Sequence, residues 1–257
     1  MKDPKAPIGV FDSGVGGLTV LSALKRVLPR EDFLYFGDTA RVPYGGKPLP
    51  MVRRFAWEIA GFLLRQGVKA LVVACNTASS AALPDLAEDL SLPVIGVLEP
   101  AAEVAKGHGK VGLIGTQATV ESRAYERYLP LAWAKACPLF VPLVEEGLWD
   151  DPVALLVARH YLEEAPEDLE ALILGCTHYP YLKGTLEKVL PGVRLIDSAE
   201  ATARKVAQVL AREGLLNPEG RGRVVHFVTG DPESYKNLAG RLGVEVAELY
   251  RVSLEEL

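Results

Sequence analysis

The sequence predicts an α/β fold made of two similar domains, each a mostly parallel sheet flanked by helices. Two observations support this prediction. Short apolar runs alternate with amphipathic segments from end to end, and the second half repeats the order of motifs found in the first. At 257 residues, the chain is long enough to give each of two domains a core of its own.

Four runs of the first half are typical of buried strands: PIGVF (7–11), FLYF (33–36), ALVVA (70–74) and PVIGV (93–97). Their β-branched and aromatic side chains, bounded by Gly or Pro, favour strands over helices. Between these runs, apolar residues recur at helical spacing, namely Leu18, Leu21 and Leu24, and then Val52, Phe55, Ile59 and Phe62. The alternation predicts a parallel sheet with helices on its faces.

Three segments of the second half match segments of the first at a nearly constant displacement. VGLIGT (111–116) resembles IGVFDS (8–13), LILGCTH (172–178) resembles LVVACNT (71–77), and RLIDS (194–198) resembles PVIGV (93–97). Because the three matches keep the same order, they indicate a duplicated domain. We expect the copies to be related by pseudo-two-fold symmetry, with the active site between them.

The last fifty residues contain another expected strand, VVHFV (224–228), and an expected helix after Asp231. Their own pattern does not say which copy they pack on. We assign residues 1–98 together with 208–257 to the first domain and residues 99–207 to the second.

The charge and composition of the chain limit the kinds of partner that it is expected to bind. The net charge is −5, which gives no electrostatic reason to expect nucleic acid or an anionic membrane surface. No stretch approaches the roughly 18 apolar residues of a membrane span, and no signal-peptide core is recognisable. Three widely spaced cysteines do not form a disulfide framework. We therefore expect a cytoplasmic protein with a small-molecule substrate.

Polar chemistry gathers where the predicted strands end. The segments are Asp12-Ser13-Gly14, Gly37-Asp38-Thr39, Cys75-Asn76-Thr77 and Cys176-Thr177-His178. Ligands of parallel sheets bind beyond the carboxyl ends of the strands. Cys75 and Cys176 occupy equivalent places in the two copies, so their sulfurs are expected to reach one cleft from opposite sides. Such a pair could remove a proton from one face of a carbon and return one to the other.

Cysteine suits proton transfer because its unperturbed pKa of about 8.5 lies near neutrality. A thiolate is also favoured at a helix N-terminus. We expect a helix from Thr77 onward after Cys75, and from Pro180 onward after Cys176. Either cysteine alone is better explained as a small core residue. Matched positions with polar neighbours favour the catalytic interpretation for the pair, whereas Cys137 is expected to be structural.

Other interpretations of these motifs stay open. A redox disulfide between Cys75 and Cys176 is conceivable, although redox pairs usually lie close in sequence. A zinc site is disfavoured because there is no CxxC and the four histidines are dispersed. The loop DSGVGGLT (12–19) lacks the Lys-Ser/Thr ending of a phosphate-binding P-loop. It suits a carboxylate held by backbone N–H groups and Ser13 at a helix start, and a plain glycine turn is the alternative.

These segments together resemble the cofactor-independent aspartate/glutamate racemase family. The resemblance is carried by GVFDSGVGGLTVL (9–21), YFGDTARVPYG (35–45), ACNTAS (74–79), GVLEP (96–100), FVPLVEEG (140–147), LGCTHYPYL (174–182) and IDSAEATA (196–203). It covers most of the chain from residue 8 to about 205. It implies interconversion of L- and D-glutamate, which supplies D-glutamate for bacterial peptidoglycan, with no cofactor and no metal. It also implies a homodimer.

The resemblance further implies roles for individual residues. Cys75 would deprotonate D-glutamate and Cys176 would deprotonate L-glutamate. Asp12 would assist Cys75, and His178 would assist Cys176. The supporting carboxylates would be Asp38 and Glu145, with Glu146 as a neighbouring alternative to Glu145. The substrate-binding positions would be Asp12, Ser13, Tyr44, Gly45, Asn76, Thr77, Thr177 and His178.

Three rival functions remain at this point. The first is a sibling enzyme that acts on aspartate or a hydantoin. The second is a dicarboxylate-binding protein without catalysis. The third is a non-catalytic inhibitor of DNA gyrase, which the acidic balance of the chain does not support.

Overall fold

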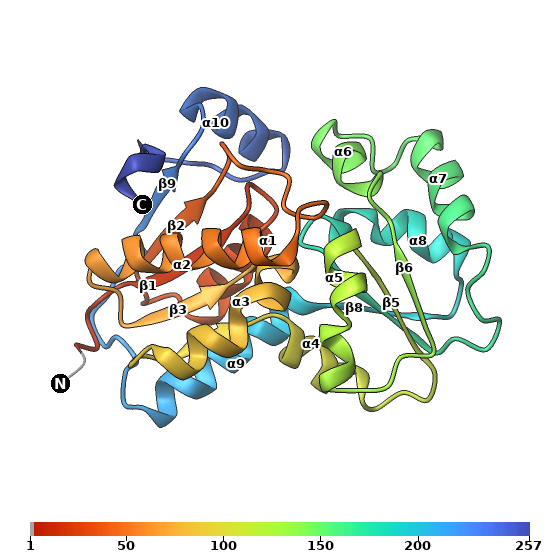
Figure 1. The fold of residues 1–257 in the computed structure, drawn as a ribbon, viewed down its shortest axis with the longest axis horizontal. Helices are drawn as coiled ribbons and strands as arrows, with labels where there is room; N and C mark the ends of the chain where they lie inside the picture. Colours follow the sequence, from red (N-terminus) through yellow and green to blue (C-terminus); the bar gives the residue numbers. More distant parts are fainter. Residues whose placement is uncertain (1–2) are drawn as a thin grey trace.

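The computed structural model describes residues 3–257, which form two units that each carry one sheet (Figure 1). The larger sheet has the order β10-β9-β2-β1-β3-β4, and the smaller has the order β6-β5-β7-β8. Every pairing between neighbouring strands is parallel. The bounds are β1 (Ile8–Asp12), β2 (Phe33–Gly37), β3 (Ala70–Val73), β4 (Val94–Gly96), β5 (Val111–Gly115), β6 (Trp133–Ala136), β7 (Ala171–Gly175), β8 (Arg194–Asp197), β9 (Val224–Val228) and β10 (Leu249–Arg251). The predicted α/β fold with two parallel sheets is confirmed.

The smaller sheet repeats the order of four consecutive strands of the larger one, from β2 to the edge strand β4. Strands β6, β5, β7 and β8 stand in the same order as β2, β1, β3 and β4. The segments that match in sequence lie on corresponding strands, 111–116 on β5 and 8–13 on β1, 172–178 on β7 and 71–77 on β3. The predicted pseudo-symmetry of the two copies is therefore visible in the topology.

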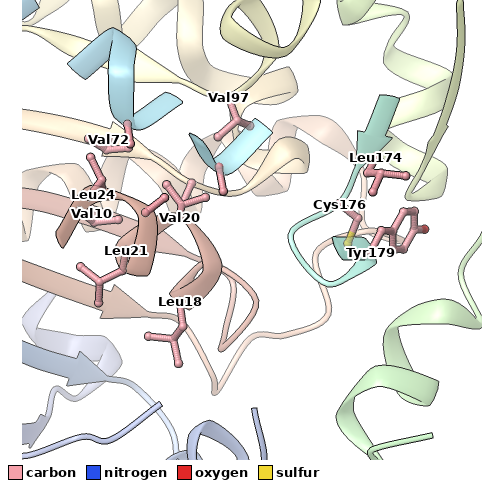
Figure 2. Packing of buried hydrophobic residues seen from close by; sticks show 14 of the residues in the cluster. Val10, Leu18, Val20, Leu21, Leu24, Val72, Val97, Leu174, Cys176 and Tyr179 are labelled. Atoms are coloured by element: carbon pink, nitrogen blue, oxygen red, sulfur yellow. The ribbon is translucent and has the colours of Figure 1, made fainter. Parts of the chain in front are cut away.

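Helices connect the strands and cover the sheets. Their bounds are α1 (Leu18–Val27), α2 (Leu49–Arg65), α3 (Asn76–Asp89), α4 (Leu98–Ala105), α5 (Gln117–Ser122), α6 (Phe140–Glu145), α7 (Pro152–Leu162), α8 (Lys183–Val189), α9 (Ser198–Arg212) and α10 (Pro232–Arg241), with 3₁₀ helices η1 (Ala124–Arg127), η2 (Tyr179–Leu182) and η3 (Leu254–Glu256). The apolar residues predicted at helical spacing are the buried faces of α1 and α2. Figure 2 shows Leu21 and Leu24 of α1 beside Val10 and Val72 of the first sheet.

The C-terminal segment returns to the first unit. Strand β9 pairs with β2, and β10 extends the same sheet. The expected helix is α10, and the Asp231 carboxylate caps it by accepting the Ser234 N–H at 2.8 Å. Helix α9 follows the second sheet but packs mainly on α1 of the first unit. The predicted boundary between residues 207 and 208 falls inside α9, so the division into domains stays a prediction.

The two units share buried apolar contacts. One contiguous core cluster contains Val10 and Val72 of the first sheet together with Leu174 and Tyr179 from the second unit. Figure 2 shows both groups, with Cys176 and Tyr179 beyond the end of β7. The core therefore fixes how the strand ends of the two sheets face each other. Within residues 3–257, no helix combines the length and apolar character that crossing a membrane requires.

Candidate active site

A cavity of about 480 Å³ lies between the two units, where several strands end. Asp12 is the last residue of β1, Cys75 follows β3, Thr116 follows β5, and Cys176 follows β7. The volume is in the usual range for sites that bind small molecules. The two cysteines belong to different sheets and line the same cavity.

All the predicted site residues except Asp38 line this cavity. Those that do are Asp12, Ser13, Tyr44, Gly45, Cys75, Asn76, Thr77, Glu145, Cys176, Thr177 and His178. The Asp38 carboxylate is buried beside the wall, where it accepts hydrogen bonds from the Tyr44 hydroxyl, from Thr229 Oγ1 at 2.8 Å and from Arg41 Nε at 2.7 Å. Asp38 therefore reaches the site through two cavity-lining residues: its carboxylate contacts Tyr44, and its backbone N–H donates to the Asp12 carbonyl at 3.1 Å.

Cys75 caps the N-terminus of α3. Its Sγ accepts the Ala78 N–H at 3.4 Å, a contact that favours the thiolate. Burial, and after it the negative charge of Asp12, outweigh this contact and raise the pKa of Cys75 to about 12. Cys75 is therefore a protonated thiol at neutral pH and needs help to give up its proton.

Asp12 is the carboxylate beside Cys75, and it is almost fully buried. One of its oxygens, Oδ2, accepts the N–H groups of Gly14 and Gly17, each at 3.0 Å. The Tyr35 hydroxyl donates a hydrogen bond to the Gly14 carbonyl of the same loop at 2.8 Å. Only one of the two carboxylate oxygens takes part in these loop hydrogen bonds, and the other is available for proton transfer.

The surroundings of Cys176 are different. Its Sγ lies 3.8 Å from His178 Nδ1, and His178 Nε2 lies 2.9 Å from Glu145 Oε1. Burial lowers the pKa of His178, but the hydrogen bonds and charges of Cys176 and Glu145 outweigh it and raise the pKa to about 10. At neutral pH, His178 is therefore an imidazolium between a sulfur and a carboxylate. Glu146, the alternative to Glu145, is exposed.

One expectation about Cys176 is wrong. It does not stand at the N-terminus of an α-helix, because the chain first forms the 3₁₀ helix η2 from Tyr179 and enters α8 only at Lys183. Pro180 occupies the first turn of η2. A short 3₁₀ turn lacks the aligned peptide dipoles of a long helix, so the main electrostatic support for Cys176 is His178.

Two glycines let loops of the first unit approach the second at the cavity wall. A Cβ atom on Gly16 would lie 2.1 Å from Thr177 Oγ1 and 2.6 Å from His178 Nδ1. A Cβ atom on Gly45 would lie 2.7 Å from Thr116 Cβ, and the Gly45 carbonyl accepts the Ala118 N–H at 2.8 Å. A plain glycine turn does not fully explain the loop 12–19, since Gly16 also leaves space for Thr177 and His178 on the Cys176 side of the site.

Sequence reasoning missed part of the lining. The additional residues are Val42, Pro43, Gly46, Thr116, Gln117, Pro138, Val141 and Pro142. Thr116 occupies the same place in the repeat as Ser13, so the displacement between the copies could have identified it. Among the described residues, no lysine or arginine lines the cavity. Its fixed donors are thus hydroxyl, amide and backbone N–H groups together with His178.

Cys137 lies outside the cavity and is buried, in agreement with a structural role. All three cysteines are free thiols. Within the described part of the chain, no group of three or more His, Cys, Asp or Glu side chains is arranged to hold a metal ion.

Comparison with known proteins identifies the family. The Asp/Glu/Hydantoin racemase model matches residues 8–206, which is most of the chain. The chain belongs to this racemase family. It is therefore an isomerase, and the resemblance carried by the sequence motifs is confirmed.

Individual relatives extend the match to the full length. A glutamate racemase of Thermus thermophilus is 82% identical over 257 residues, which are 100% of both chains. The crystal structure of glutamate racemase from Thermus thermophilus in complex with beta-chloro-D-alanine superposes with a TM-score of 0.98 over 100% of both chains. A glutamate racemase from Francisella tularensis in complex with D-glutamate is 37% identical, with a TM-score of 0.93 over 99% of this chain and 100% of that one.

Proposed function

We propose that this racemase interconverts L- and D-glutamate by moving the α-proton between two cysteines, without a cofactor. The observation that carries the proposal is that Cys75 and Cys176, from corresponding places in two different sheets, line one cavity. The glutamate racemases that match the full chain support the choice of substrate.

In the proposed reaction, the thiolate of one cysteine takes the α-proton and leaves a carbanion. The thiol of the other cysteine then gives its proton to the opposite face, which inverts the carbon. Cys75 acts on D-glutamate and Cys176 on L-glutamate, as the family resemblance implies. Asp12 accepts and returns the proton of Cys75. The imidazolium of His178, 3.8 Å from the Cys176 sulfur, gives its proton to Cys176 and takes it back.

The carbanion is the hardest part of this reaction, because an amino acid's α-proton is weakly acidic. No lysine or arginine lines the described cavity, so the substrate carboxylates have to be held mainly by hydroxyl and amide donors. We propose that Ser13, Asn76 and Thr177 supply them, with the substrate ammonium kept protonated. Fixed donors in a closed cavity stabilise developing charge more strongly than water does.

Solvent deuterium incorporation tests the mechanism. The wild type should exchange the α-hydrogen of both enantiomers in deuterated water and racemise each. Cys75→Ser should lose exchange from D-glutamate, Cys176→Ser should lose exchange from L-glutamate, and both should lose most racemisation. Cys137→Ser is the matched control and should behave as the wild type. Full racemisation by either single active-site variant would refute the two-cysteine pairing.

The same assay separates the rival functions. A panel of enantiopure glutamate, aspartate and hydantoins, followed by polarimetry, identifies the preferred substrate. A dicarboxylate-binding protein would bind glutamate without any exchange of its α-hydrogen.

We also propose that the chain acts as a cytoplasmic homodimer with no nucleic-acid or membrane partner. Three free thiols fit a reducing compartment, and a net charge of −5 fits a chain that avoids nucleic acid. Light scattering of the purified chain at several concentrations would show twice the monomer mass. A monomeric mass throughout would contradict the dimer.

A further inference from the structure

The amide of Asn76 has one satisfied end and one unsatisfied end. Asn76 is the first residue of α3, directly after Cys75, and its side chain is buried at the cavity. Its Oδ1 accepts a hydrogen bond from the Tyr125 hydroxyl. Its Nδ2 is buried and has no hydrogen-bond partner in the described protein. A buried amide donor without a partner costs free energy unless a ligand accepts its hydrogens.

Tyr125 determines which end of this amide stays free. The tyrosine is fully buried on η1 of the second unit, so the contact crosses between the units. Burial raises the pKa of Tyr125 well above its usual value, so its hydroxyl keeps its proton and acts as a donor. If the amide were turned over, the hydroxyl would face another donor and lose its acceptor. The hydroxyl therefore selects the orientation that leaves Nδ2 free.

The backbone around this amide is also fixed. The Ser80 hydroxyl donates to the Asn76 carbonyl at 2.8 Å. The next residue, Thr77, pairs with Thr116 of the second unit through their hydroxyl oxygens at 2.8 Å. The start of α3 is thus held from within the helix and from the opposite unit, and the amide orientation is the remaining freedom.

We infer that Tyr125 is a positioning residue for the racemisation: it directs the Asn76 amide N–H₂ group to a carboxylate of the substrate. The inference rests on the proposed function, since the acceptor is a carboxylate of glutamate. Tyr125 does not line the cavity, so it acts through Asn76.

A double-mutant cycle tests this inference with the full chain and glutamate. Tyr125→Phe should lower kcat/KM by about tenfold, the effect expected for loss of one oriented hydrogen bond to a charged group. Asn76→Ala should lower kcat/KM by at least as much. In the Asn76→Ala background, Tyr125→Phe should have no further effect, because the group that it orients is gone. Tyr128→Phe, a change of the same kind at the end of the same 3₁₀ helix, should leave kcat/KM unchanged.

A second variant tests the orientation with Tyr125 intact. Asn76→Asp keeps an oxygen for the Tyr125 hydroxyl but replaces the N–H₂ group by an oxygen that repels a carboxylate. We expect a loss of kcat/KM of about tenfold or more, and the unfolding midpoint, measured alongside, reports the cost of the buried charge separately. Wild-type kcat/KM in Asn76→Asp would overturn the inference even if Tyr125→Phe did not fold.

Two further outcomes would also overturn the inference: wild-type kcat/KM in Tyr125→Phe, or an undiminished effect of Tyr125→Phe in the Asn76→Ala background. In both cases the wild type would still racemise glutamate, so the proposed function would stand. A wild-type chain that does not racemise glutamate would overturn the proposed function and this inference together.

Discussion

Each half of the cavity has one cysteine, but the acid/base group beside that cysteine differs between the halves. On the first side, Cys75 has the Asp12 carboxylate as neighbour and the N-terminus of α3 behind it. On the second side, Cys176 has His178, which Glu145 holds from the other end of the ring. In the repeat, Asp12 corresponds to Gly115 and His178 corresponds to Thr77. Duplication thus explains the paired thiols, while their acid/base partners are specific to each copy.

This difference gives the two thiols opposite electrostatic surroundings. Burial, and after it a negative neighbour, raise the pKa of Cys75 to about 12, so this side starts as a thiol. On the other side, His178 has a pKa of about 10, so its imidazolium places a positive charge beside the Cys176 sulfur. The enantiomers have equal free energies, so any substitution must change kcat/KM by the same factor in both directions. The asymmetry can therefore be seen only in kcat and KM taken separately, or in isotope exchange.

Of the substitutions that probe the difference between the two sides, Asp12→Asn should lower kcat/KM most. The amide oxygen can still accept the N–H groups of Gly14 and Gly17, but the group that takes the proton of Cys75 is lost. We expect kcat/KM to fall by about 10²–10³-fold, as for loss of a general acid/base. Exchange of the α-hydrogen from D-glutamate should fall more than exchange from L-glutamate.

An Asp→Asn change at a helix cap separates the specific loss at Asp12 from the general effect of such a substitution. Asp231 caps α10 through its carboxylate, far from any cavity-lining residue in sequence. Asp231→Asn should reduce stability slightly and leave kcat/KM unchanged. Equal losses in the two variants would mean that the loss at Asp12 is not specific to a proton acceptor beside Cys75.

The sequence predicted more of the first side than of the second. Asp12 ends β1, Ser13 follows it, and Cys75 comes two residues after the end of β3, so strand periodicity alone places them at one sheet edge. Glu145 lies 33 residues before its partner His178, and no local pattern links them. The family resemblance suggested Glu145, and only the packing of α6 beside η2 separates it from Glu146.

Contacts between the units were beyond sequence reasoning for the same physical reason. Tyr125 lies on a short 3₁₀ helix with no recognisable motif. Only its hydrogen bond to Asn76 links it to the site. The 3₁₀ turn after Cys176 was mistaken for an α-helix start because Pro180 is favourable in the first turn of either. Local propensity could not decide between them.

Gly16→Ala should have the next largest effect on kcat/KM, because Gly16 lies against Thr177 and His178, where the two units are in contact. The added methyl group would collide with Thr177 Oγ1 and the His178 ring, and the ring would have to leave its position between Cys176 and Glu145. We expect a loss of about 1–3 kcal/mol in the free energy of unfolding and at least a tenfold loss in kcat/KM. Gly107→Ala is the control, since a Cβ there meets nothing within 4 Å and Gly107 does not line the cavity.

Denaturant titration and steady-state kinetics on both glycine variants measure these effects. If Gly16→Ala retained wild-type kcat/KM, the close approach would not be needed for the Cys176 side. If Gly107→Ala lost as much activity, the loss would reflect a general intolerance of side chains at loop glycines rather than this contact.

Glu145→Gln should change kcat least at neutral pH, but it should shift the pH dependence of kcat most clearly. Glu145 helps to raise the pKa of His178 from 6.5 to about 10, so removing its charge should lower that pKa. The alkaline limb of kcat, which reports loss of the imidazolium, should then move down by about one pH unit or more. The low-pH limb, set by other groups, should stay in place.

Stability should change in the same sense as activity. A histidine with a raised pKa in the folded state stabilises the fold fully below its unfolded pKa of about 6.5, and this stabilisation is lost as the pH rises towards 10. The wild type should therefore lose unfolding free energy between pH 6.5 and 10, and Glu145→Gln should lose less over that range. Glu146→Gln, one residue away and exposed, should follow the wild type in both measurements. An alkaline limb that did not move in Glu145→Gln would mean that the charge of His178 is not what serves Cys176, and the contrast between the two sides would then rest on Asp12 alone.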